Sequence, residues 1–169
     1  MKKTDLAYLA GLVDGEGCVR IKKTQAYKCQ GRQTPGYHAV IQVRMVDEAA
    51  IKFLADTLGG WYYREKPHSC QGRPLYCFSA SDLAAKGILQ KLLPFLRIKG
   101  QQARLAIELC EAKKTGHKFR TKVVGFRDFP NAAGVVRRVP NLAYSDEFVG
   151  RLETLYQRVK TLNRVGALA

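Results

Sequence analysis

Acidic residues are scarce in this chain of 169 residues. Its 14 Asp and Glu are outnumbered by 29 Lys and Arg, which gives a net charge of +15 at pH 7. No acid occurs between residues 18 and 46, where six Lys or Arg are found. Because a compact domain with this much positive charge repels itself, binding to a polyanion would be favourable. The composition therefore favours nucleic acid as the partner.

Long apolar runs are also lacking. No stretch is long enough to span a bilayer, and the basic residues are not confined to one amphipathic helix of the membrane-surface kind. The short apolar stretch after Lys2 and Lys3 does not indicate a signal peptide, because acids lie within it and directly after it. We therefore expect no membrane partner and a location in the cytoplasm or an organelle matrix.

Cysteine spacing excludes two further classes of protein. The five cysteines form no CxxC pair and no Cys/His ligand pattern, so neither a zinc site nor a secreted disulfide framework is indicated. Cys29 and Cys70 both fall near predicted hairpin tips and could pair if the source tolerates intracellular disulfides. The other three are expected to be ordinary buried thiols.

The first segment of the chain predicts a helix over about residues 5 to 14, with Thr4 as its N-cap. Ala7, Ala10 and Gly11 are three to four residues apart and share one face of that helix. Small side chains there would let a second helix backbone approach closely, which explains a glycine that lowers helix propensity by about 1 kcal/mol. We expect these three residues to form a helix-packing interface.

An acid follows at the end of this helix. Gly15 and Gly17 are expected to end the helix and to let the chain turn sharply. Glu16 then lies at the tip, near the negative end of the helix dipole, where a carboxylate is destabilised unless a cation compensates it. A divalent metal is the obvious cation.

Residues 18 to 46 predict a long hairpin, with strands over about 18–28 and 37–46. Polar and apolar residues alternate along both strands, so one face of the hairpin is polar. Its mixture of cations with Gln and Thr suits a DNA duplex, because cations contact phosphates while Gln and Arg read base edges. The candidate DNA-binding residues of this hairpin are Arg20, Lys22, Thr24, Lys28, Gln42 and Arg44.

A second unit of the same kind follows. A helix is predicted over 47–58, a hairpin from strands over about 61–66 and 73–80, and a helix over about 82–93 that Pro94 ends. The further candidate DNA contacts are Arg64, Lys66 and Arg73. The expected order is thus helix, two strands, helix, two strands, helix.

The nonapeptide Leu-Ala-Gly-Leu-Val-Asp-Gly-Glu-Gly at 9–17 resembles the motif of the LAGLIDADG homing endonucleases, with six of nine residues identical. Glu16 stands at the eighth position, which carries the catalytic acid of that family. The resemblance implies an α+β fold with an αββαββα core, in which four antiparallel strands form a saddle over DNA. It also implies site-specific, metal-dependent cleavage of double-stranded DNA that leaves short 3′ overhangs, as in an intron-associated homing endonuclease.

The same resemblance implies roles for individual residues. Glu16 and the backbone carbonyl of Gly15 would hold Mg²⁺, or another divalent cation such as Mn²⁺. Residues 94–103 are similar to a turn that opens a helix in single-motif members, and there Lys99 takes the place of an active-site lysine. Arg97 and Lys91 are alternatives nearby. Asp14 is expected to be mainly structural.

One motif supplies one acid, whereas a duplex has two strands to cut. We therefore expect a homodimer on a long, nearly palindromic target, with Ala7, Ala10 and Gly11 packed against their symmetry mates. Two other functions stay open: an RNA-binding maturase, with intron RNA as a further partner, and a non-cleaving DNA-binding regulator. An acid at position 16 and Lys99 favour cleavage, because binding alone needs neither.

The last third of the chain is expected to extend one structural domain. Residues 1–115 would form the endonuclease core, and 116–144 a basic loop or arm. Residues 113 to 138 hold eight Lys or Arg and one acid, with several Gly and Pro. Residues 145–169 predict a helix whose apolar stripe folds back on the core.

Overall fold

A four-stranded antiparallel sheet organises the computed structural model, which describes residues 2–26, 34–65, 72–130 and 136–165. The strand order is β1–β2–β4–β3, so the two expected hairpins meet through β2 and β4. The strands are β1 Gly17–Thr24, β2 Gly36–Met45, β3 Trp61–Glu65 and β4 Leu75–Ser81. Each strand lies where the alternation of polar and apolar residues predicts it, within a few residues at the ends.

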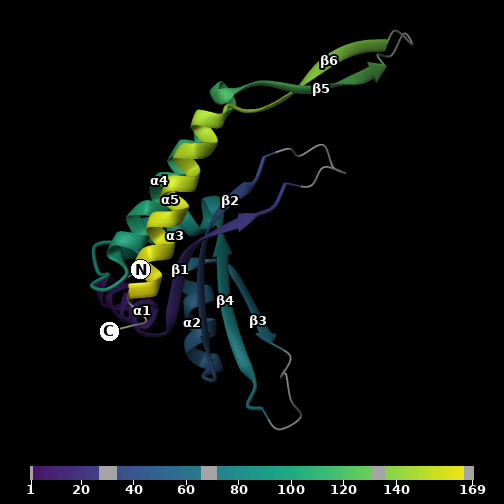
Figure 1. Cartoon of the computed structure of the whole chain (residues 1–169). Coiled ribbons are helices and arrows are strands. Elements are labelled where there is room, and N and C mark those ends of the chain that lie inside the picture. The colour runs from purple at the N-terminus through teal and green to yellow at the C-terminus, as the bar shows by residue number, and fades with distance from the viewer. Residues whose placement is uncertain (1, 27–33, 66–71, 131–135, 166–169) are drawn as a thin grey trace.

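Helices cover one face of this sheet, and the other face is open (Figure 1). They are α1 Lys3–Glu16, α2 Glu48–Leu58, α3 Asp82–Leu92, α4 Gly100–Lys114 and α5 Asp146–Val165. From α1 to α3 the chain runs helix, two strands, helix, two strands, helix. The predicted α+β fold with an αββαββα core is confirmed.

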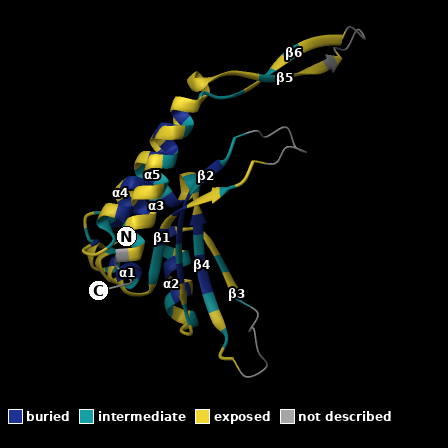
Figure 2. Cartoon of the chain, in the orientation of Figure 1, coloured by how far each residue is buried: buried dark blue, intermediate teal, exposed yellow. Residues whose placement is uncertain are grey.

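The hydrophobic core lies between the sheet and the helices (Figure 2). Alternate residues of β1 and β2 point into it, among them Val19, Ile41 and Val43. Leu9 of α1 and Leu109 of α4 pack over them and are fully buried. Because the inward residues of the sheet are apolar, its polar residues are left for the open face.

The segment predicted as a basic loop is instead a second sheet. A short 3₁₀ turn, η2 Gly116–Phe119, leads into β5 Arg120–Pro130, which pairs antiparallel with β6 Val136–Tyr144. Register shifts between residues 120 and 122 and between 123 and 125 interrupt the pairing. These irregularities and the scattered Gly and Pro removed the alternation by which the sequence could have shown strands. The expected loop was wrong, although the segment does form an arm.

The last helix returns to the core as expected. Phe148, Leu152, Leu155 and Val159 of α5 are buried in the main hydrophobic cluster. The Asn163 side chain also donates a hydrogen bond of 3.1 Å to the backbone carbonyl of Val19 in β1. In the described part of the chain, no helix has the length and apolar character needed to cross a membrane.

Candidate nuclease site and DNA-binding face

Helix α1 presents its final residue, Glu16, at the junction with the sheet. The helix begins at Lys3, with Lys2 rather than Thr4 at the N-cap, and it continues through Gly15 to Glu16. Gly17 alone ends it: a Cβ there would lie 2.5 Å from the carbonyl oxygen of Val13. Glu16 is exposed at the helix C-terminus, where its charge is unfavourable toward the dipole.

Asp14, two residues before Glu16, is buried and fully engaged. Its carboxylate accepts hydrogen bonds from the backbone N–H groups of Arg97 (2.6 Å), Ile98 (3.1 Å) and Lys99 (2.9 Å). These donors precede and open α4, whose first N–H groups have no partner within the helix. Asp14 therefore fixes the start of α4 against the end of α1, which agrees with its expected structural role.

Lys99 is held at the end of α1 by this arrangement. Its ammonium group donates a hydrogen bond to the backbone carbonyl of Asp14, two residues before Glu16. The same residue is thus fixed twice, through its backbone N–H and its Nζ. Arg97 also lies in this turn, but no hydrogen bond or ion pair of its side chain is found within the described residues. The geometry favours Lys99 over Arg97 and Lys91 as the cation beside Glu16.

The donor set near Glu16 suits a hard divalent cation that is only partly enclosed by one subunit. No group of three or more His, Cys, Asp or Glu side chains that could hold a metal occurs in the described residues. Mg²⁺ is typically bound by one or two carboxylates, with waters and substrate phosphates completing the shell. The backbone carbonyl of Gly15 lies in the last turn of α1, where carbonyl groups have no partner within the helix. Glu16 and this carbonyl fit such a composite site.

The three predicted interface residues do not all lie on the same side of α1. Ala10 is completely buried in the core of its own subunit. Ala7 and Gly11 are exposed, on the side of α1 that also carries Gly15. Ala10 is therefore a core residue, and its assignment to a surface between subunits is corrected. Helical spacing gave the common stripe but not the direction in which each residue points.

The open face of the sheet contains a shallow concavity of about 390 Å³. It gathers most of the DNA-binding candidates of the first hairpin with residues from β4. Its lining is Arg20, Lys22, Thr24, His38, Val40, Gln42, Ser79 and Ser81. Ser79 and Ser81 were missed from the sequence, although the alternation of β4 would have placed them on the polar face.

Hydrogen bonds link this face across the strands. Arg20 donates to the side-chain oxygen of Gln42 at 3.3 Å, and the Gln42 amide lies 3.2 Å from the sulfur of Cys77. Arg44 instead forms an ion pair of 2.6 Å with Glu65 of β3. Arg20 and Gln42 are thus positioned together for a ligand, whereas Arg44 must share its charge with Glu65.

His38 lies at one edge of the concavity and serves as a hydrogen-bonding residue. Its Nδ1 is 2.7 Å from the carboxylate of Asp82, which also forms a 2.7 Å ion pair with Lys113. Partial burial acts to raise the pKa of Asp82, but the hydrogen bonds with His38 and Lys113 outweigh it and lower the pKa. This cluster links β2, α3 and α4 at the edge of the open face.

The remaining candidates have different outcomes. Arg64 alternates with Tyr63 and Glu65, which contact Gln42 and Arg44 on the open face, so it lies on the opposite face of β3. Arg73 is exposed in the segment before β4. Lys28, Lys66 and both cysteines considered for pairing, Cys29 and Cys70, lie outside the described residues. Of the other cysteines, Cys77 and Cys110 are buried as expected, and Cys18 is half-buried.

No family model matches the chain. The DNA endonuclease I-CreI of Chlamydomonas reinhardtii is 29% identical over 128 residues, which cover 69% of this chain and 71% of that protein. The solved structure of the homing endonuclease I-CvuI matches with a TM-score of 0.64 and 17% identity, over 95% of this chain and 82% of that one. An archaeal intron-encoded homing endonuclease, I-Vdi141I, matches with a TM-score of 0.66 and 13% identity, over 96% and 86%. The chain thus has the αββαββα fold of these homing endonucleases, and in sequence it is similar to the DNA endonuclease I-CreI.

Proposed function

We propose that the protein is a site-specific endonuclease that hydrolyses phosphodiester bonds in double-stranded DNA. The observation that carries the proposal is that Glu16 is exposed at the end of α1 and that the Lys99 ammonium group binds the backbone carbonyl of Asp14, two residues before it in the chain. An exposed acid beside a held cation, at the edge of a basic sheet, is more than binding alone requires. I-CreI, a relative over two thirds of this chain, is a DNA endonuclease.

The sheet is proposed to hold the duplex. Arg20 and Lys22 would contact phosphates, and Gln42, braced by Arg20 and Cys77, would read a base edge. Thr24 and the serines of β4 add hydroxyl donors to the same concavity. The solved structures of I-CvuI and I-Vdi141I contain DNA, which supports assigning this open face to a duplex.

At the scissile phosphate, the residues of this chain would have three tasks. Glu16 and the Gly15 carbonyl would hold a divalent cation, Mg²⁺ or Mn²⁺, which when bound supplies a water of lowered pKa and neutralises developing negative charge. Lys99 would place a positive charge against the phosphate as charge builds in the transition state. Asp14 acts through Lys99, as a positioning residue that fixes its backbone. I-CvuI has been crystallised with DNA in the presence of Mg and of Ca, in keeping with a divalent cation.

A homodimer is proposed as the active form. Ala7 and Gly11 leave an exposed, small-residue side of α1, and a Cβ at Gly11 would meet no atom within 4 Å in the subunit. The exposed rings of Tyr8 and Phe53 contact each other beside it, with centroids 6.2 Å apart. Packing of this surface on a two-fold axis would bring two Glu16 tips together, one for each DNA strand.

Cleavage of a randomised duplex library tests the proposal. The protein is incubated with the library and Mg²⁺, and the cut ends are sequenced. We expect one family of nearly palindromic sites with short 3′ overhangs, and no cleavage when the metal is chelated. Glu16→Gln is the matched control: it should bind DNA as the wild type does and cut none of it. Cleavage by this variant would refute the role of Glu16, and absence of cutting by the wild type would refute the proposed function.

A further inference from the structure

The β5–β6 hairpin carries a charge pattern that the nuclease site does not use. Near its base, Lys122 forms an ion pair of 2.9 Å with Asp146 of α5, and the guanidinium of Arg120 lies 5.1 Å from the ring centre of Tyr144. Lys122 thus ties the hairpin to α5, whereas the contact of Arg120 lies between the two strands of the hairpin. The cations farther along it are Arg127, Arg137 and Arg138.

The outer cations are all exposed to solvent. Arg138 pairs across the strands with Asp128, the one acid of the described hairpin, and lies over the ring of Phe126. The side chain of Arg137 is exposed and has no hydrogen bond, ion pair or ring contact with any described residue. Isolated two-stranded hairpins are marginally stable in water, and the Arg137 side chain, which contacts no described residue, adds no stability to this one. A partner outside the chain would explain why Arg137 and Arg138 lie here.

The position of the hairpin indicates where that partner lies. It leaves the body beyond the end of α4 and the start of α5, and in Figure 1 it projects to the same side as the β1–β2 hairpin. Its described side chains are mostly exposed (Figure 2), and of these only Tyr144, at its base, packs against the hydrophobic core. At about 3.3 Å per residue, the 11 residues of β5 extend about 35 Å, close to one turn of B-DNA.

We propose that the β5–β6 hairpin is a second DNA-binding element, which contacts the phosphate backbone of the duplex beyond the part held by the sheet. This inference rests on the proposed function of the sheet. The outer hairpin offers arginines among apolar side chains, without the Gln and Thr that accompany the cations of the open face. It is therefore suited to phosphates and not to base edges, so its contribution is independent of DNA sequence.

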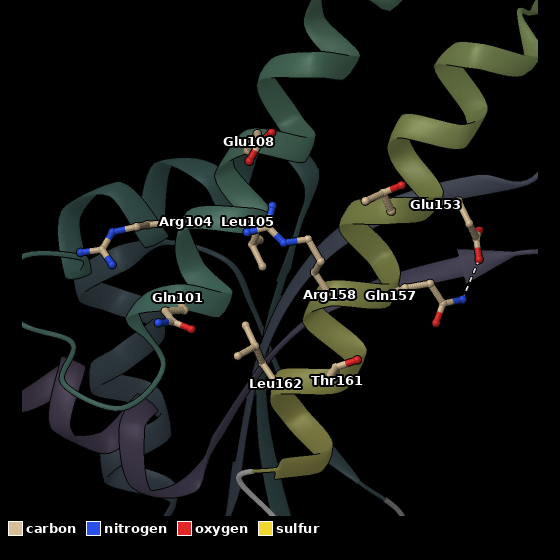
Figure 3. Close-up of a pocket in the computed structure, with 10 residues that line it drawn as sticks. Gln101, Arg104, Leu105, Glu108, Glu153, Gln157, Arg158, Thr161 and Leu162 are labelled. Atoms are coloured by element: carbon tan, nitrogen blue, oxygen red, sulfur yellow. Dashed lines mark hydrogen bonds between the residues drawn. The ribbon is translucent and has the colours of Figure 1, made fainter.

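The test compares binding to random-sequence duplexes of about 20 and about 40 base pairs, roughly two and four helical turns. Binding is followed by fluorescence anisotropy over a range of KCl concentrations, without divalent metal. The variant is Arg137→Gln with Arg138→Gln. The matched control is Arg104→Gln with Arg158→Gln, which removes the same charge from two exposed residues in the groove between α4 and α5 (Figure 3). Arg137→Lys with Arg138→Lys preserves the charge.

For the wild type we expect a steeper dependence of log affinity on log salt with the longer duplex. The Gln variant should lose this difference, with a slope smaller by about 2 per subunit, since each phosphate contact contributes about 0.9. The control and the Lys variant should keep it. An unchanged slope in the Gln variant or an equal loss in the control would overturn the hairpin assignment alone. A wild type that binds no duplex would overturn the proposed function as well.

Discussion

The inner side of α1 is buried in the core, whereas its outer side is exposed, although both belong to one short motif. On the inner side, Leu9, Ala10 and Val13 are completely buried, and Asp14 accepts three backbone hydrogen bonds. On the outer side, Gly11 and Glu16 are exposed. The difference teaches that the motif combines residues that fold the subunit with exposed residues that we propose to act on other molecules. Substitution on the two sides should therefore affect different measurements.

The largest contrast is expected between the two acids. Asp14→Ala would leave three backbone N–H donors without their acceptor at a buried position, which we expect to cost about 3 kcal/mol in the free energy of unfolding. Glu16→Ala should change that free energy by less than about 0.5 kcal/mol, or raise it slightly, because a carboxylate is unfavourable at a helix C-terminus. Urea unfolding of both variants measures the difference. Equal destabilisation by the two substitutions would contradict the division of α1.

The sequence predicted the αββαββα core well, because its strands and helices each bury one regular face. Val19 and Ile21 alternate with Arg20 and Lys22, and that pattern is visible in the sequence without any knowledge of partners. The partners of Asp14 could not be read in this way. They lie 83 to 85 residues farther along the chain, in a turn whose position depends on the packing of α1 against α3.

The β5–β6 hairpin shows where prediction from sequence patterns failed. It has no buried face, so polar and apolar residues need not alternate, and its register shifts break the pattern further. Similarly, Ala7, Ala10 and Gly11 could be grouped by helical spacing, but only the packed core shows that Ala10 points inward. Sequence periodicity thus located the faces that pack regularly within the chain. It failed at the hairpin, which has no buried face, and at Ala10, whose direction depends on the packed core.

A second contrast, of intermediate size, is expected between neighbouring small residues. Ala10→Leu inserts three carbons into a filled core and should lower the free energy of unfolding by about 2 kcal/mol. Gly11→Leu meets no atom in its own subunit and should stabilise the monomer by about 0.7 kcal/mol through helix propensity.

Between subunits the order should reverse. A leucine at position 11 would hold the two α1 helices apart, so Gly11→Leu should sediment as a monomer at concentrations where the wild type is a dimer. Sedimentation equilibrium, together with thermal unfolding at low protein concentration, separates the two effects. A Gly11→Leu variant that dimerises as tightly as the wild type would exclude this side of α1 as the interface.

The smallest expected effect concerns a held carboxylate outside α1, Glu153 of α5. Partial burial acts to raise its pKa, but hydrogen bonds from Lys23, Tyr37 and Gln157 outweigh burial and lower the pKa from 4.5 to about 2. Because the pKa is lower in the folded state, Glu153 stabilises the fold above about pH 4.5, and this contribution is lost as the pH falls toward about 2.

Glu153→Gln should therefore lower stability at neutral pH and flatten the decline below pH 4.5, as measured by urea unfolding along a pH series. Tyr37→Phe removes one of the three hydrogen bonds and should give a decline between those of the wild type and Glu153→Gln. The effect should be modest, since ion pairs that are partly exposed, as that of Glu153 and Lys23 is, are screened by solvent. Glu153 thus resembles Asp14 in accepting several hydrogen bonds, but its carboxylate is more exposed to water than that of Asp14. If the three proteins lost stability in parallel below pH 4.5, the hydrogen bonds to Glu153 would not stabilise the fold. The burial of Asp14, and not its number of donors, would then account for its larger expected effect.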